Sequence, residues 1–95
     1  MHARVVRFTD VSPERIAEIV ARIEREDGPP PGVPATAMKL LFDEAQSTAV
    51  FIGFFETEEN LREGNAALEQ MDSAETPGTR ASVDLCEVKI EQSAG

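Results

Sequence analysis

Residues 49–55 read Ala-Val-Phe-Ile-Gly-Phe-Phe and contain no polar side chain. The run has the length of a strand and is rich in β-branched and aromatic residues, so it predicts a β-strand. A strand with one face in water alternates apolar and polar side chains, whereas this one is apolar on both faces. We therefore expect both faces of the strand from Ala49 to Phe55 to be covered.

Two other segments predict helices. The first begins at Ser12, a good N-cap, and places Pro13 at the first helical position. Its apolar residues recur at the spacing of one helix face: Ile16, Ile19, Val20 and Ile23. The second begins at the cap Thr57, and its stripe is Leu61, Gly64 or Asn65, Leu68 and Met71. Two helices can cover only one face of a small sheet. The simplest cover for the other face is a second copy of the chain.

The remaining strands are expected at residues 3–9, 36–43 and 79–91. Residues 28–34 hold four of the six prolines and predict a rigid crossover loop, while the short polar segment 44–47 predicts a hairpin. In the last strand Val83 and Leu85 share one face, and the apolar pattern then moves to the other face from Cys86 onward. A bulge near Leu85 and Cys86 would produce this slip, and so would cover on both faces.

The element order is therefore strand, helix, strand, strand, helix, strand. Right-handed crossovers and antiparallel pairing turn this order into an α+β, ferredoxin-like βαββαβ sandwich. It has a four-stranded antiparallel sheet with two helices on one face. At 95 residues the chain is expected to form a single domain, residues 1–95.

Composition limits the possible partners. The formal net charge is −9, with 18 acidic against 9 basic residues, so nucleic acid and anionic membrane surfaces would repel the protein. No apolar run approaches the roughly 18 residues of a membrane span, and no secretory signal precedes the first strand. We expect a cytoplasmic protein without membrane or nucleic-acid partners.

The residue types used most often in catalysis and metal binding are scarce. His2 is the only histidine and Cys86 the only cysteine, and they lack the paired spacing of a metal site. There is no Gly-rich phosphate loop, and no Ser-His-Asp set can be built around His2. The sequence therefore predicts no metal and no cofactor, and its catalytic residues, if it has any, are unknown.

Gly64 and Asn65 lie in the middle of the second helical stripe, where bulky apolar residues normally stand. A mid-helix Gly costs roughly 1 kcal/mol relative to Ala, so it needs a reason. One reading is that Gly64 leaves space between helix and sheet and Asn65 places an amide in that space. The other is that Gly64 permits close packing and Asn65 points to water.

Arg7, Phe42 and Phe54 complete the set of candidate pocket residues. Arg7 shares a strand face with Val5 and Thr9, and could pair with an anionic ligand or with an aspartate. It could equally be a structural partner or extend to the surface. Several large apolar residues belong either to the core or to the wall of a pocket for a flat aromatic ligand: Phe8, Met38, Phe42, Phe51, Phe54 and Phe55.

Three stretches resemble the antibiotic-biosynthesis-monooxygenase-like branch of the dimeric α/β-barrel proteins. They are Pro31-Gly32-Val33 before the second strand, the passage from Phe55 through Glu56-Thr57-Glu58-Glu59-Asn60 to Leu61, and the closing strand Val83 to Ile90. The resemblance spans residues 3–91. It implies that the open sheet faces of two protomers pack into a shared barrel, which agrees with the expectation from residues 49–55.

The resemblance also implies possible activities. Several members of the family are cofactor-independent oxygenases of polycyclic phenols, and others degrade haem with a His and a Trp around the second helix. Residues 57–71 contain neither His nor Trp, which argues against haem degradation. Three functions remain: a monooxygenase-like enzyme acting on a small aromatic compound, a non-catalytic small-ligand binder, and a purely structural homodimer. Arg7 and Asn65 are the polar candidates for the first.

Overall fold

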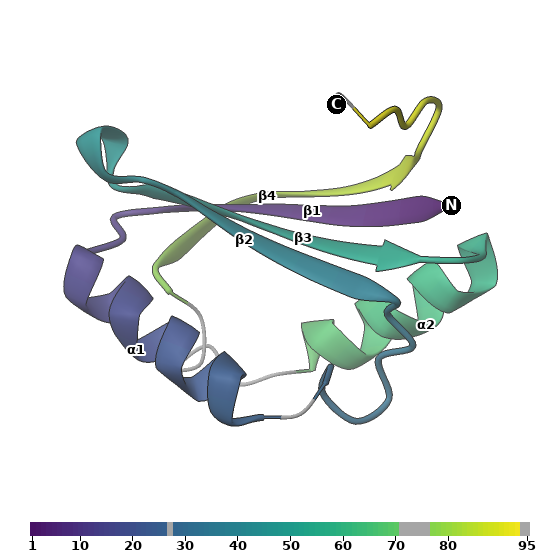
Figure 1. Ribbon diagram of the computed structural model, residues 1–95, viewed down its shortest axis with the longest axis horizontal. Coiled ribbons are helices and arrows are strands. Elements are labelled where there is room, and N and C mark those ends of the chain that lie inside the picture. The colour runs from purple at the N-terminus through teal and green to yellow at the C-terminus, as the bar shows by residue number, and fades with distance from the viewer. Residues whose placement is uncertain (27, 71–76, 94–95) are drawn as a thin grey trace.

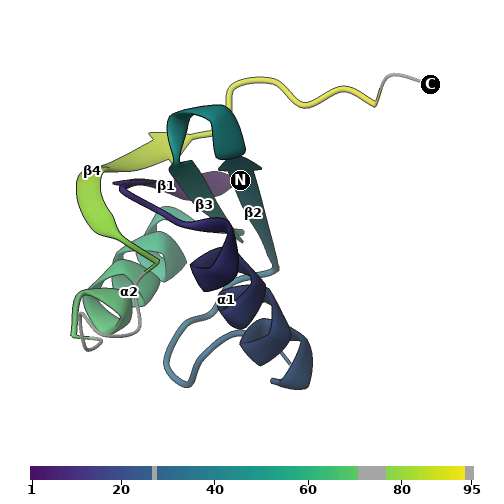
Figure 2. The same cartoon turned by 90° about the vertical axis from the view of Figure 1, so that its left-hand side faces the viewer.

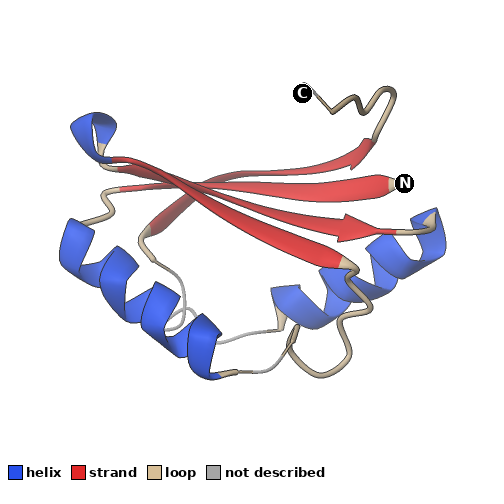
Figure 3. Ribbon diagram, in the orientation of Figure 1, coloured by secondary structure: helices blue, strands red, loops and turns tan. Residues whose placement is uncertain are grey.

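The structure is a computed structural model that describes residues 1–26, 28–70 and 77–93. Its elements follow the predicted order: β1 (His2–Thr9), α1 (Pro13–Arg25), β2 (Ala37–Asp43), a short 3₁₀ turn η1 (Glu44–Gln46), β3 (Thr48–Phe55), α2 (Glu58–Glu69) and β4 (Thr79–Glu87). The four strands form one layer, and both helices lie on the same side of it (Figure 1). Strands and helices thus make a two-layer α+β fold (Figure 3).

The sheet is antiparallel throughout, with the strand order β2-β3-β1-β4. The apolar strand β3 is central, because it pairs with β1 on one side and with β2 on the other. This arrangement is compatible with the predicted ferredoxin-like sandwich. When the molecule is turned by 90° about the vertical axis of Figure 1, the two helices are seen to diverge from each other below the sheet (Figure 2).

Both helices begin where their capping residues predict. The Ser12 hydroxyl accepts a hydrogen bond from the backbone N–H of Arg15 at 3.1 Å, and Thr57 accepts one from Asn60 at 3.0 Å. In α1, Ile19 is buried, whereas Val20, which was expected on the same stripe, is 38% exposed. The last predicted stripe residue of the second helix, Met71, lies outside the described residues.

The core lies between the sheet and the helices and has two parts. Val6, Phe8, Val11 and Ala49 are buried at one end of the sheet. Val33, Phe55 and Leu61 are buried at the other end, between the proline-rich loop, β3 and α2. Two small clusters rather than one continuous core leave room between them.

The last strand differs from the prediction in two ways. β4 ends at Glu87 rather than Glu91. Its bulge lies at Ala81, where Arg7 pairs with Ser82 but Phe8 pairs with Arg80, and not at Leu85 and Cys86. Of the two explanations offered for the slip, the bulge near Leu85 and Cys86 was wrong, because the apolar residues beyond the strand, Val88 and Ile90, were counted as part of its alternation.

The face of the sheet opposite the helices is covered by neither α1 nor α2 (Figure 1). The register places Val5, Val50 and Ile52 together there, because Val5 pairs with Ile52 and Arg7 with Val50. Leu41 lies beside Val50 on the same face and is 51% exposed. Both faces of β3 are therefore apolar, as predicted, and its second face is only partly shielded within one chain.

Candidate functional site

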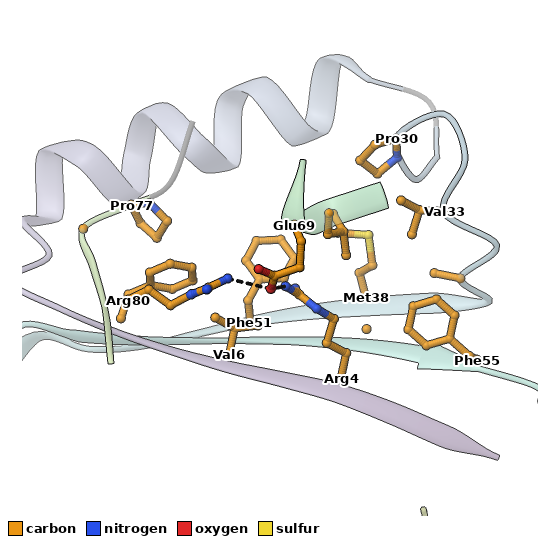
Figure 4. A pocket seen from close by; sticks show the side chains of 15 residues that line it. Arg4, Val6, Pro30, Val33, Met38, Phe51, Phe55, Glu69, Pro77 and Arg80 are labelled. Atoms are coloured by element: carbon orange, nitrogen blue, oxygen red, sulfur yellow. Dashed lines mark hydrogen bonds and ion pairs between the residues drawn. The ribbon is translucent and has the colours of Figure 1, made fainter. Parts of the chain in front are cut away.

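A cavity of about 440 Å³ lies between the sheet and the helix layer. Its walls come from all four strands, the end of α2 and the proline-rich loop before β2 (Figure 4). The described lining residues are Arg4, Val6, Phe8, Pro30, Val33, Ala35, Met38, Phe51, Gly53, Phe55, Leu68, Glu69, Pro77, Gly78 and Arg80. Small-molecule sites in proteins commonly have about 300–1,000 Å³, so the cavity has the size of a ligand site.

Strand alternation places the apolar wall. Every second residue of a strand points to the same face, so Phe51, Gly53 and Phe55 of β3 all face the helices. Gly53 pairs with Arg4 on β1 and with Met38 on β2, and it contributes no side chain to the space between them. A Cβ at Gly53 would lie 3.4 Å from Cε2 of the Phe55 ring, so a glycine here leaves this part of the cavity wall to that ring.

One side of the cavity carries a polar cluster made by residues far apart in sequence. Arg4 on β1 donates from Nε to Oδ1 of Asn65 on α2 at 2.8 Å. Nη2 of Arg4 and Nη1 of Arg80, on β4, both donate to Oε1 of Glu69, at 3.1 and 2.7 Å (Figure 4). The Arg4 side chain is 11% exposed, whereas Glu69 and Arg80 are 39% and 46% exposed. The cluster therefore runs from the interior of the fold to solvent.

The cluster carries two guanidinium groups and one carboxylate, so its formal charge is positive in a chain whose net charge is −9. The hydrogen bond from Arg80 is the main reason that the pKa of Glu69 is lowered, and the bond from Arg4 adds to it. Burial lowers the pKa of Arg4, but a guanidinium stays protonated in proteins. At neutral pH all three groups are charged, and Glu69 is a weak base.

Gly64 packs directly against β3. A Cβ atom on Gly64 would meet the Phe55 ring at 2.8 Å from Cζ and closer still to Cε1. Phe55 is fully buried, and its ring can lie directly against α2 only because Gly64 has no side chain. Of the two alternatives for Gly64, space between helix and sheet or close packing, the structure shows close packing. The neighbouring Asn65 instead turns its amide toward Arg4 at the cavity.

None of the five predicted pocket residues is among the described residues that line this cavity, and Asn65 reaches it only through its hydrogen bond with Arg4. Arg7 is exposed, and the register places it and Phe54 on the face opposite the helices. Phe42 packs against the buried cluster around Val6 and Phe8. Arg7 was chosen because it shares a face with Val5, but the face that borders the cavity is the one that carries Arg4, Val6 and Phe8.

Arg4, Glu69 and Arg80 were missed as site residues. For Arg4 the signal was present, since it lies on the same strand face as Phe8, which was expected in the core or in a pocket wall. Glu69 stands four residues after Asn65, on the same side of α2. Arg80 could not be placed from sequence, because the bulge at Ala81 shifts which residues of β4 face the helices.

No three His, Cys, Asp or Glu side chains gather into a possible metal site within residues 1–26, 28–70 and 77–93. Neither of the two described α-helices is long and apolar enough to cross a membrane. A scan of the chain against protein-family models finds no match. A search of curated proteins likewise finds no relative.

Proposed function

We propose that the chain is a small-ligand-binding protein that holds a flat, largely apolar compound, such as an aromatic one, in the cavity between sheet and helices. The observation that carries the proposal is the wall of the cavity. Phe51, Phe55 and Met38 border a space of about 440 Å³ that also has a hydrogen-bonding cluster on one side. Apolar walls with a few placed polar groups are typical of ligand sites.

Binding without catalysis is favoured by the chemistry of the lining. A general base works best when its pKa lies near the operating pH. The carboxylate at the cavity, Glu69, has a lowered pKa, and the other two charged groups among the described lining residues are the guanidinium groups of Arg4 and Arg80. These groups can hold and orient a ligand, but they are poorly suited to removing a proton from it.

We infer further that two copies pack through the open sheet face, in a ferredoxin-like dimeric barrel of the kind that the sequence resembles. Support comes from the apolar side chains that the register places on that face: Leu41, Val50, Ile52 and Phe54. Burying such a patch against its equivalent removes apolar area from water at about 25 cal/mol per Å². Native mass spectrometry tests this inference, with twice the 10.3-kDa chain mass expected.

The ligand-binding proposal is tested with 2-naphthylmethanol, a flat neutral probe, by isothermal titration calorimetry. We expect saturable binding of one probe per chain. Ala35→Leu adds volume at the cavity wall and should weaken binding at least tenfold. Ala66→Leu makes the same change on the exposed side of α2 and should leave it unaltered. Absence of binding, or equal effects of the two variants, would contradict the proposal.

A second candidate is a cofactor-independent monooxygenase-like enzyme that uses the same cavity. It is favoured by the Arg4–Asn65 pair, since Asn65 fixes the guanidinium of Arg4, which lines the cavity and can donate to the oxygen of a phenol held against the apolar wall. Oxygen uptake with 1-naphthol and with larger polycyclic phenols tests it. Uptake that is lost in Asn65→Ala but kept in the control Asn60→Ala, at a residue in the first turn of α2 that does not line the cavity, would support an enzyme. No uptake above the buffer rate would leave binding alone.

A further inference from the structure

We propose that the cavity selects an anionic ligand. Its apolar ring system lies against Phe51 and Met38, and its carboxylate or sulfonate binds Arg4 and Arg80. In the absence of ligand, the Glu69 carboxylate occupies the position of that anion, and the ligand displaces it on binding. The inference rests on the proposed function and names the class of ligand. It also means that the Glu69 carboxylate and the anionic group of the ligand compete for the same two arginines.

The first support is that neither arginine makes paired hydrogen bonds to Glu69, although Arg4 also donates from Nε to Asn65. Arg4 and Arg80 both donate to the same oxygen, Oε1 of Glu69, through one nitrogen each. A guanidinium binds a carboxylate best through two parallel hydrogen bonds. An oxyanion that entered from the cavity could present two or three oxygens to the pair, where Glu69 presents one.

The second support is the position of Glu69 in its helix. Glu69 is the last residue of α2, and the last turn of that helix contains no basic residue. The C-terminal end of a helix carries a partial negative charge, so a carboxylate there is unfavourable by itself. The two arginines hold Glu69 against this local repulsion. With 39% of its side chain exposed, Glu69 can turn to water when another anion takes its partners.

The third support is the match of charge and shape. Among the described lining residues the charged groups sum to +1, from Arg4, Arg80 and Glu69. Removal of Glu69 from the cluster would raise this to +2 beside a wall of apolar side chains. The nearly buried Arg4 then needs an anion, since a charge in a low-dielectric site is costly without a partner. An aromatic carboxylate or sulfonate supplies both an apolar body and that charge.

The test compares 2-naphthoate and 2-naphthalenesulfonate with neutral 2-naphthylmethanol, by calorimetry at pH 7 and low salt. Both anions should bind the wild-type protein at least threefold more tightly than the alcohol. Glu69→Gln removes the competing charge and should strengthen binding of both anions about tenfold, with less than a twofold change for the alcohol. Glu58→Gln makes the same substitution at the exposed Arg62–Glu58 pair of α2 and should change neither.

A second pair of variants tests the arginine side. Arg80→Gln should weaken anion binding at least threefold and spare the alcohol, whereas Arg62→Gln, with the same loss of charge, should have no effect. Thermal melting verifies that each variant is folded. If Glu69→Gln does not fold, the comparison of anion binding by Arg80→Gln and Arg62→Gln decides whether the cavity selects an anion.

The outcomes separate the two proposals. If no probe binds, the proposed function fails. If the alcohol binds but the anions bind no more tightly, and Glu69→Gln and Arg80→Gln leave their affinities unchanged, the cavity is a neutral site and the inference is overturned. If Glu58→Gln raises anion affinity as much as Glu69→Gln, the effect comes from net charge, and the role assigned to Glu69 is wrong.

Discussion

Replacement of Gly64 by Ala changes the free energy of unfolding through two opposing effects of known size. Ala favours a helix interior by roughly 1 kcal/mol over Gly, so the exchange should stabilise α2 by that amount. The new methyl group, however, would lie 2.8 Å from Cζ of the Phe55 ring, which is fully buried. To restore an ordinary carbon–carbon distance of about 3.5 Å or more, the ring has to move by several tenths of an ångström or further.

Overpacking of this kind costs typically about 1–3 kcal/mol. Set against the gain in helix propensity, the expected change in the free energy of unfolding is between no change and a loss of about 2 kcal/mol. Phe55 lines the cavity, and the space open to its ring is the cavity itself. Gly64→Ala should therefore also weaken binding of 2-naphthylmethanol, because the displaced ring takes up part of the volume.

Urea denaturation measures the stability change, and Ala66→Gly supplies the control. Ala66 is exposed on the same helix, so its replacement by Gly should show the propensity effect alone, a loss of about 1 kcal/mol. If Gly64→Ala raised the free energy of unfolding by about 1 kcal/mol and bound the probe as well as wild type, its effect would be equal and opposite to that of Ala66→Gly, as expected from helix propensity alone. The close approach of α2 to Phe55 would then be refuted.

Three further predictions concern the cap, the charge cluster and the open face. Thr57→Ala removes the side-chain oxygen that accepts from Asn60 and should lower the free energy of unfolding by about 1 kcal/mol; an unchanged urea midpoint would contradict this. The pKa of Glu69 is lower folded than unfolded, so its contribution to stability is present above the unfolded value of about 4.5 and is lost as pH falls through the folded value. Wild type should thus lose more stability on acidification than Glu69→Gln, and parallel losses would exclude Glu69 as a source. Ile52→Lys on the open face should turn the proposed dimer into a monomer in native mass spectrometry, whereas a dimer that survives would place the interface elsewhere.

The sequence predicted the elements of the fold well because each had a local physical signal. Ser12 and Thr57 start the helices as caps, and the seven apolar residues 49–55 form a central strand. The bulge of β4 was misplaced, because a register shift depends on the partner strand β1 and not on the apolar pattern of β4 alone. Pairing in the sheet is a non-local property that one strand does not encode.

The candidate site was predicted only in part, for a related reason. Asn65 was named from its place on α2, and it does reach the cavity cluster. Arg7 was named and Arg4 was not considered, and the two lie on opposite faces of β1 because successive residues of a strand alternate between its faces. The face that borders the cavity is set by the packing of α1 and α2, and that packing brings together Arg4, Glu69 and Arg80 from three separate elements.

We propose that a flat ligand binds between sheet and helices with its anionic group at Arg4 and Arg80. A crystal structure of the protein with 2-naphthoate tests it most directly. We predict the ring system against Phe51 and Met38, the carboxylate within hydrogen-bonding distance of both guanidinium groups, and Glu69 turned away to solvent. A ligand seated on the open face of the sheet, or a cavity without ligand at tenfold the solution Kd, would show that the anion does not bind at Arg4 and Arg80.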